Sequence, residues 1–479
     1  MRRRIALVAA LGVVTCGQPD DNGPSADATA LEAEPIGTLL IRDVHIVPMT
    51  HDTVLRDQSV RIVGGKIDRI APAAELPPEE EDVVVEGEGR FLLPGLVDFH
   101  AHVRDESELL SYLAFGVTTV VNMRGSPEHL DLAKAVEAGG TLGPRILTSG
   151  PLIDGDPPIW SGSGTVVAAT PDAAREVVAE QAMAGYHLIK TYNNLDPDAL
   201  RAAVEEAEIH GLAVVGHLPR NPDRATALQK ALDAGMAMIP NAEEIYFTYL
   251  GGSGDAGMSD APQSVEPARI REAARLVAEA GAAVTPNLSF VEMTARMLED
   301  VDAVLGHPES RYLSPAVLAM WREENPTRRD DRARFEAREA VKAPAVRALT
   351  RELQRAGVPL LLGTDASAPG LYPGWSAVLE LEELVRAGLT SYQALSAATR
   401  TAGEFLSAHV PGTDPLGRVE EGMSADLVLV DGNPLEDVSR IGDPAGVVLR
   451  GRWFPREELA SRRSAAEPRP EMRQSPTER

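Results

Sequence analysis

Two hydrophobic patterns divide the chain. From residue 37 to residue 92, short runs rich in β-branched residues alternate with glycine and charged residues, which predicts β-strands. From residue 93 to residue 408, short apolar runs are followed by stretches with helical spacing, most of which end in glycine. Glycine is the usual left-handed stop of a helix, so this region predicts alternating strands and helices. Short β runs return over residues 409–455.

The middle region predicts a (β/α)8 TIM barrel, that is, an α/β fold. Its eight apolar strand candidates alternate with helical stretches, which is typical of a parallel barrel. A segment dense in Arg, Asp and Glu at 300–344 separates the seventh and eighth strands, and we expect a helical lid or edge element there. The β regions at 37–92 and 409–455 flank the barrel, and the simplest packing joins them in one small β domain.

The N-terminus has the pattern of an export signal. Three arginines precede an apolar run from Ile5 to Val14, which is too short to cross about 30 Å of hydrocarbon as a helix. The lone cysteine, Cys16, follows this run, as in bacterial lipoprotein signals, although Thr15 departs from the small residue preferred before the cysteine. We expect residues 1–16 to direct export, to the periplasm or to the outer membrane through a lipid on Cys16. A plain cleaved signal and a secreted protein are the alternative.

Two further segments lack apolar periodicity. Residues 17–36 contain acidic residues and no basic ones, which predicts a disordered acidic linker. Residues 456–479 are rich in Arg, Glu, Ser and Pro and predict a disordered tail.

The charge balance narrows the choice of partners. Lys and Arg number 46 and Asp and Glu 72, a formal net charge of −26, so the surface repels phosphate backbones. A single cysteine excludes an internal disulfide and a cysteine-based zinc site. We therefore expect a small-molecule substrate, no nucleic acid, and membrane contact only through a lipid anchor at Cys16. The oligomeric state stays open.

Three polar side chains end predicted strands at the barrel mouth. His100 and His102 close the first strand two residues apart, so their imidazoles point to one face and can clamp a metal ion. Asp365 ends the eighth strand in "LLLGTDAS", where its carboxylate could ligate a metal and accept a proton from water. The alternatives are surface histidines and an aspartate that caps the next helix.

Two more candidates end the fourth and fifth strands. Lys190 lies late in "HLIKTY", where burial of an ammonium is costly unless the group is paired or modified. His217 ends "LAVVGHL". The alternatives are a lysine whose amine reaches water and a loop histidine with ordinary partners.

Together, "LLPGLVDFHAHV", Lys190, His217 and "GTDAS" resemble the metal-dependent amidohydrolase superfamily. The closing stretch "LGRVEEGMSADLVLVDGNPLEDV" is similar to the end of the composite β-sandwich of that superfamily. The nearest resemblance is to prolidase-like dipeptidases and imidazolonepropionase-like proteins. It implies a barrel with a composite β-sandwich, and metal-activated water that attacks an amide or a similar electrophile.

The resemblance also implies ligand roles. His100 and His102 would hold the first metal, and Lys190, carboxylated by CO2, would bridge two metals. His217 would hold the second metal, and Asp365 would ligate the first and act as general base. One or two divalent ions, zinc in the first place, are therefore the expected cofactors.

Asn241 departs from the family pattern. The sixth strand in this group usually ends in histidine, whereas here the phrase is "MIPNAEEIY". Asn241 is thus a weaker ligand, or the site holds one metal, or catalysis has been lost. We favour one firm metal, with the second weaker or absent. Glu243 and Glu244 could supply a carboxylate, or they could be a solvated helix start.

Contacts to substrate are expected near the strand ends. Tyr192 and Arg124 could hold a carboxylate or an oxyanion, and Tyr246 lies just past the sixth strand. Trp160, like Tyr372 and Trp375, lies in a predicted mouth loop and could line the pocket. Loop packing is the alternative for each of these residues.

The sequence as a whole predicts an exported metal-dependent hydrolase of C–N bonds, acting on an amide, a dipeptide or a cyclic amide. An ester, lactone or N-acetyl hydrolase at the same site is one alternative. A non-catalytic barrel lipoprotein with a degraded metal site is the other, and Asn241 is the residue that favours it.

Overall fold

The computed structural model describes residues 37–220, 226–250 and 264–468. The predicted signal with Cys16, the acidic linker and the last residues of the tail lie outside these ranges. Within them, every helix is too short or too polar to pass through a bilayer.

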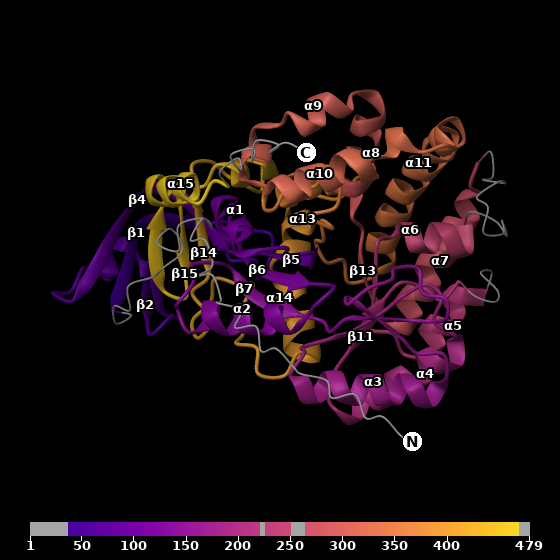
Figure 1. The fold of residues 1–479 in the computed structure, drawn as a ribbon. Helices are drawn as coiled ribbons and strands as arrows, with labels where there is room; N and C mark the ends of the chain where they lie inside the picture. Colours follow the sequence, from indigo (N-terminus) through magenta and orange to yellow (C-terminus); the bar gives the residue numbers. More distant parts are fainter. Residues whose placement is uncertain (1–36, 221–225, 251–263, 469–479) are drawn as a thin grey trace, which may run out of the picture.

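A ring of parallel strands forms the centre of the molecule (Figure 1). Its members are β5 (Leu96–Ala101), β6 (Val117–Asn122), β7 (Arg145–Thr148), β10 (Ile189–Thr191), β11 (Val214–Gly216), β12 (Met238–Pro240), β13 (Ala283–Thr285) and a last segment at residues 360–366. Single bridges close the ring: Ser149 pairs with Leu188, Val284 with Leu360, and Ala101 with Ala366. The predicted (β/α)8 barrel is confirmed.

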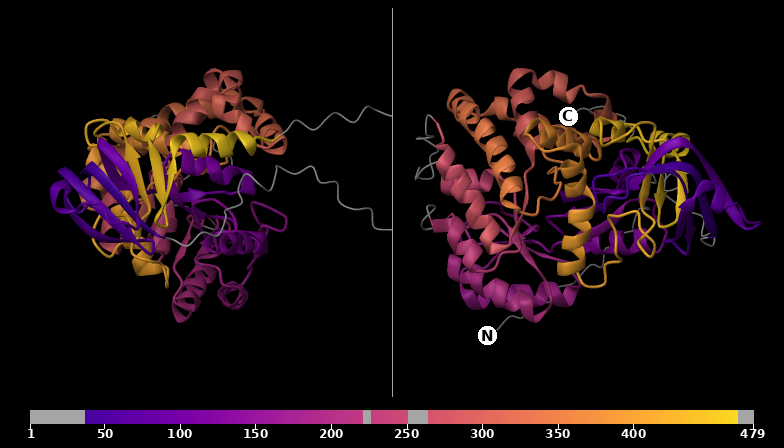
Figure 2. Two further views of the ribbon diagram at one scale, coloured as in Figure 1. Left: turned by 90° about the vertical axis from the view of Figure 1, so that its left-hand side faces the viewer. Right: turned by 180° about the vertical axis from the view of Figure 1, so that it is seen from behind.

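Helices cover the outside of this ring (Figure 2). After the successive strands come α1 (Leu109–Ala114), α2 (Pro127–Glu137), α3 (Pro171–Ala184), α4 (Pro197–Ile209), α5 (Ala227–Asp233), α7 (Pro267–Ala280), α8 (Leu288–Glu299), α11 (Arg332–Ala356), α12 (Trp375–Arg386), α13 (Ser391–Ala398) and α14 (Arg400–His409). Local signals set their ends: the Thr170 side chain caps α3, and Gly185 ends it at φ 91°. Every residue of β5 and β6 is buried, as expected of strands enclosed between a packed interior and helices.

Segments from both ends of the chain build one seven-stranded sheet beside the barrel, visible in indigo and yellow in Figure 2. Its strands, in spatial order, are β16 (Arg452–Pro455), β15 (Gly446–Leu449), β14 (Leu427–Val430), β4 (Asp82–Pro94), β1 (Thr38–Ile46), β2 (Leu55–Val63) and β3 (Lys66–Pro72). The pairing of β14 with β4, Val428 opposite Leu93, joins the two ends. The predicted composite β domain is thus present.

The sheet leads directly into the barrel, because β4 ends at Pro94 and β5 begins at Leu96. Gly95 between them allows this close approach, since a Cβ there would stand 2.1 Å from Thr118 Oγ1. The first strand of the barrel, which contains His100 and ends just before His102, is therefore joined to the β domain through a single residue.

The predicted insertion is helical, but its boundary at residue 344 is wrong. It contains α9 (Val301–Leu305), α10 (Pro315–Glu324) and two short 3-10 turns, and α11 then runs unbroken from Arg332 to Ala356 with Pro344 inside it. Core contacts of Ala345, Val346, Leu349 and Leu353 hold the helix through the proline.

The insertion packs on the loop that follows the last strand. Trp321 is fully buried and donates to Ser367 O at 3.1 Å, and its ring meets Tyr372 edge-on. His307 lies against both Tyr372 and Trp375. Tyr372 is therefore a buried packing residue (1% exposed) rather than an open pocket wall.

The predicted disorder of residues 456–479 is wrong for its first part, because residues 456–465 form helix α15 (Arg456–Ala465). Leu459 and the following Ala466 bury themselves in an apolar cluster with α1 and β15. Arg463 is buried as well, ion-paired with Glu309 of the insertion and stacked 3.6 Å from the centre of the Tyr312 ring. These contacts with distant segments were not visible in the local pattern.

Replacing Arg463 with alanine removes the cation that neutralises Glu309. We expect the free energy of unfolding to fall by roughly 3 kcal/mol, since breaking a buried pair leaves an uncompensated charge. Urea unfolding measures this change. The control is Arg462→Ala on the same helix, whose partly exposed pair with Glu458 is worth less than about 0.5 kcal/mol. Equal losses in the two variants would show that α15 is not fastened through Arg463.

Candidate active site

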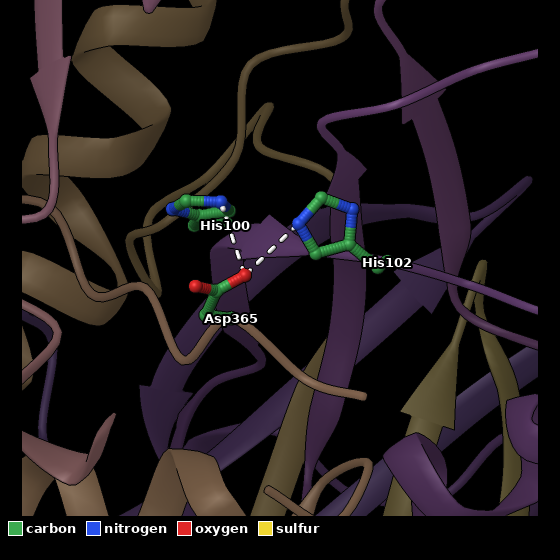
Figure 3. A group of neighbouring side chains, drawn as sticks. All are labelled: His100, His102 and Asp365. Carbon is green, nitrogen blue, oxygen red and sulfur yellow. Dashed lines mark ion pairs between the residues drawn. The ribbon is translucent and has the colours of Figure 1, made fainter. Parts of the chain in front are cut away.

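His100, His102 and Asp365 meet at one point of the barrel mouth (Figure 3). Asp365 Oδ1 lies 2.9 Å from His102 Nε2 and 3.4 Å from His100 Nε2. The three ligand atoms lie within 4.8 Å of one another, and they form a group that could hold a metal ion. The structure thus brings together three residues that the sequence placed on the first and last strands.

Backbone contacts between these strands fix the geometry. The amides of Thr364 and Asp365 both donate to His100 O, at 3.2 and 2.6 Å, and His102 N donates to Ala366 O. Asp365 adopts a left-handed conformation at φ 66°, which turns the chain sharply where its carboxylate faces the histidines.

Electrostatics set the protonation states of two of these groups. Burial lowers the pKa of His100 well below its ordinary value, and the attraction of Asp365 does not compensate. Burial raises the pKa of Asp365, but the neighbouring His100 and His102 outweigh it and hold this pKa well below the usual range. At neutral pH, His100 is therefore a neutral imidazole and Asp365 a carboxylate, the forms that ligate metals.

Asp98, which the sequence analysis did not single out, links the strand of His100 to the segment that carries Asp365. It is fully buried, accepts from His100 N at 3.2 Å and Thr364 N at 3.1 Å, and receives the Thr364 hydroxyl at 2.6 Å. Burial raises its pKa to about 7 despite these hydrogen bonds. Its signal was an aspartate two residues before His100 inside an otherwise apolar strand.

A second buried carboxyl holds the loop after Asp365. Glu108 accepts from Arg104 N and from the Ser367 hydroxyl, both at 3.0 Å. Burial raises the pKa of Glu108 to about 8. No local pattern signals this role, because Glu108 lies in an acidic run that resembles an exposed helix start.

Lys190 lies inside the barrel near the same group. It ends up 2% exposed in β10, and its Nζ has no hydrogen-bond partner among the described residues. Burial lowers its pKa to about 8, while the charges of Asp365 and Glu244 act in the opposite direction. An orphaned amine in such a position fits a group that is modified or that faces an ion.

His217 has two acceptors at one ring nitrogen. Its Nδ1 lies 3.3 Å from Glu244 Oε1 and 3.2 Å from Asn193 Oδ1. Because both partners are acceptors, the proton belongs on Nδ1, and Nε2 keeps a lone pair for a ligand. Burial lowers the pKa of this histidine, which favours the neutral ring.

Glu244 is a buried orienting group and not a solvated helix start. It is 2% exposed, accepts from Asn193 Nδ2 at 2.8 Å and forms an ion pair with Arg220. Burial raises its pKa, but Arg220 and His217 outweigh this and hold the pKa well below its ordinary value. Its charge therefore fixes the imidazole of His217, as carboxylates behind metal-ligating histidines commonly do.

Asn241 follows β12 at φ 61° and is 7% exposed. The Asn287 amide is oriented so that both its nitrogen and its oxygen have hydrogen-bond partners. In this orientation its nitrogen donates to Asn241 Oδ1 at 3.2 Å and to Thr285 Oγ1 at 2.7 Å. In the same orientation the oxygen of the Asn287 amide is the atom that lies 3.4 Å from His100 Nδ1. The Asn241 oxygen thus lies near the site but already has a hydrogen-bond partner.

The three predicted substrate contacts have different surroundings. Tyr192 stacks on His217 with ring centres 4.3 Å apart, and its hydroxyl accepts from Trp160 Nε1 at 2.9 Å. Arg124 donates to Gly164 O at 3.3 Å. Tyr246 is 2% exposed, and the charges acting on its hydroxyl come from α11.

A parallel barrel whose first and last strands present two histidines and an aspartate at one mouth defines a class of hydrolases that can use a bound metal. The sequence profile of the amidohydrolase family matches residues 91–454, and the chain belongs to this family. It is therefore a hydrolase of carbon–nitrogen bonds, as the sequence predicted.

The individual proteins that this chain resembles are similar over short segments or at low sequence identity. Ochratoxinase of Aspergillus niger is 37% identical over 94 residues, which is 19% of this chain and only 18% of that protein. A solved structure of bottromycin amidohydrolase superposes with a TM-score of 0.69 at 23% identity and covers 94% of each chain. A Xaa-Pro dipeptidase with bound methionine gives a TM-score of 0.65 at 22% identity, over 87% of this chain and all of that one (100%). The structural likenesses show the shared fold.

Replacing Lys190 with methionine tests the burial of its amine. In metal-free, bicarbonate-free protein the folded pKa is about 8 against 10.5 for the free side chain, so the unfolded state binds the proton more tightly. Below pH 8 this difference in pKa lowers the free energy of unfolding by roughly 3 kcal/mol, and the loss vanishes as the pH rises toward 10.5. We expect Lys190→Met to be the more stable protein at pH 7, with the gap closing near pH 10.5, by urea unfolding.

Lys342 is the matched control. It is as deeply buried as Lys190 but ion-paired with Glu243 at 2.7 Å and Glu339 at 2.8 Å, so Lys342→Met should lower stability at pH 7. A Lys190→Met protein that is less stable than wild type at pH 7 would contradict this account of Lys190.

Proposed function

We propose that this C–N hydrolase works with a divalent metal, zinc in the first place, held by His100, His102 and Asp365. One observation carries the proposal: Asp365 Oδ1 lies 2.9 and 3.4 Å from the two histidine nitrogens. Ligand atoms about 2.0–2.1 Å from a tetrahedral ion stand about 3.3 Å apart, so the group fits such an ion. When bound, the ion supplies a lowered pKa of water and polarisation of the carbonyl of the substrate.

Lys190 and His217 are proposed as the second half of the site. The Nζ of Lys190, which has no hydrogen-bond partner in the part of the chain that the structure describes, and the Nε2 lone pair of His217 support this. The neutral amine of Lys190 would add to CO2, forming an N–C bond and releasing one proton, which converts a buried neutral amine into an anionic ligand. A pKa of about 8 leaves part of the amine neutral near pH 7. Asn241 would be a weak ligand, because Asn287 competes for its oxygen.

The residues of the chain divide the proton transfers among them. Asp365, ionised and 15% exposed, takes a proton from the water that attacks the carbonyl and passes it to the leaving nitrogen. Tyr192 accepts the indole N–H of Trp160, so its own O–H remains available to donate to an oxygen of the substrate. Glu244 keeps His217 in the tautomer that presents Nε2.

A small amide, in particular a dipeptide or a cyclic amide, is the proposed substrate. The likeness to a Xaa-Pro dipeptidase and to bottromycin amidohydrolase supports an amide bond. We therefore take Xaa-Pro dipeptides as the first probes.

Replacing Asp365 with asparagine removes the proton acceptor with little change in shape. We expect kcat to fall by about 10²–10⁴-fold or more, because general base catalysis contributes that much, while circular dichroism stays unchanged. Turnover of Xaa-Pro and cyclic-amide probes measures the effect, with the exposed Asp131→Asn as control. Full activity in Asp365→Asn would overturn the assignment.

Metal content tests the ligand set separately from turnover. Elemental analysis of protein purified in bicarbonate without chelators should find about one firmly bound ion per chain. His102→Ala should lose this ion and His217→Ala should retain it. A second ion that disappears only in His217→Ala would show that the weaker site also fills, and no ion after reconstitution with zinc or manganese would refute the proposal.

A further inference from the structure

The loop between β8 (Leu152–Asp154) and β9 (Thr165–Val167) is fastened to the segment that follows Lys190. The fully buried carboxylate of Asp154 accepts three backbone amides: Gly155 at 2.9 Å, Ile159 at 2.7 Å and Asn194 at 2.8 Å. Asn194 in turn donates through its side chain to Pro157 O at 2.9 Å. This loop is held in a defined position beside the site by hydrogen bonds at several points.

The fixed loop presents two large apolar side chains to solvent. Ile159 is 50% exposed and Trp160 is 47% exposed. Trp160 is anchored at its polar end, since the indole N–H donates to the Tyr192 hydroxyl. Tyr192 stacks on His217, and the charge of Asp365 acts on its hydroxyl. Trp160 therefore borders the catalytic mouth directly, and Ile159 precedes it in the same loop.

We propose that Ile159 and Trp160 form an apolar wall that receives the hydrophobic side chain of the substrate next to the cleaved amide bond. The inference rests on the proposed function and adds the substrate class to it: amides with a branched aliphatic or aromatic side chain. Covering exposed apolar surface with a ligand makes the free energy of binding more favourable. A wall whose backbone and indole are already fixed loses little conformational entropy in doing so.

The anchoring hydrogen bond also links the wall to catalysis. The indole N–H occupies a lone pair of the Tyr192 oxygen and so directs the tyrosine O–H elsewhere. Trp160 is thus a specificity residue through its ring surface and a positioning residue through its N–H. Two substitutions separate these roles: Trp160→Ala removes both, and Trp160→Phe removes the N–H and retains most of the ring surface.

The test compares Leu-Pro with Gly-Pro, which differ in the side chain that the wall would cover. We expect the wild type to prefer Leu-Pro by about tenfold or more in kcat/KM, the range of a hydrophobic contact. In Trp160→Ala this ratio should fall toward one, mainly through KM for Leu-Pro. Trp160→Phe should keep the ratio and lower kcat for both dipeptides. Ile209→Ala, at an apolar side chain 75% exposed on α4, should leave both rates and their ratio unchanged.

Tryptophan fluorescence gives a readout that does not depend on turnover. Leu-Pro should change the emission of the wild type more than Gly-Pro does, and the difference should be absent in Trp160→Phe. Equal rates for both dipeptides in wild type and Trp160→Ala would overturn the wall and leave the proposed hydrolase intact. A Leu-specific emission change without cleavage would support the wall and refute the dipeptide as substrate. No binding of Leu-Pro by either measurement would overturn the inference.

Discussion

The closure of the barrel between its first and last strands is the constraint on which the site depends. His100 O accepts two amides from residues 364 and 365, and the buried carboxyl of Asp98 bonds to both strands. These contacts hold an imidazole and a carboxylate from opposite ends of the barrel sequence within 3.4 Å. A metal ion tolerates displacements of only a few tenths of an ångström in its ligands. The contacts between β5 and residues 364–366, here called the seam, therefore both close the barrel and set the geometry of the site.

Buried carboxyl groups extend this arrangement outward from the seam. Glu108 holds the loop after Asp365, and Trp321 of the insertion donates to the same loop at Ser367 O. Helix α8 begins directly after Asn287, and Glu380 on α12 accepts a hydrogen bond from Ser289 N in its first turn. The insertion consequently acts less as a separate lid than as part of the support of the catalytic loop.

The two buried lysines show how the same residue type serves different ends. Lys342 on α11 has two carboxylates within 2.8 Å, and its pair with Glu243 links α11 to the short helix α6 (Glu243–Ile245) after β12. Lys190 has no hydrogen-bond partner among the described residues, at the centre of the barrel. Structural burial of a cation comes with its counter-charges, so an unpaired one marks the place where another component of the reaction is expected.

The sequence by itself determined the alternation of strands and helices, the joining of the two end segments, and the strand-end positions of His100, His102 and Asp365. These follow from local spacing, since strand ends in a parallel barrel meet at one mouth. Only the tertiary structure decided the roles of Asp98, Glu244 and α15, and the boundary of the insertion. Each of these depends on partners far away in the chain. The local sequence around an acidic residue in a helical or apolar run is the same whether the residue faces water or a buried histidine.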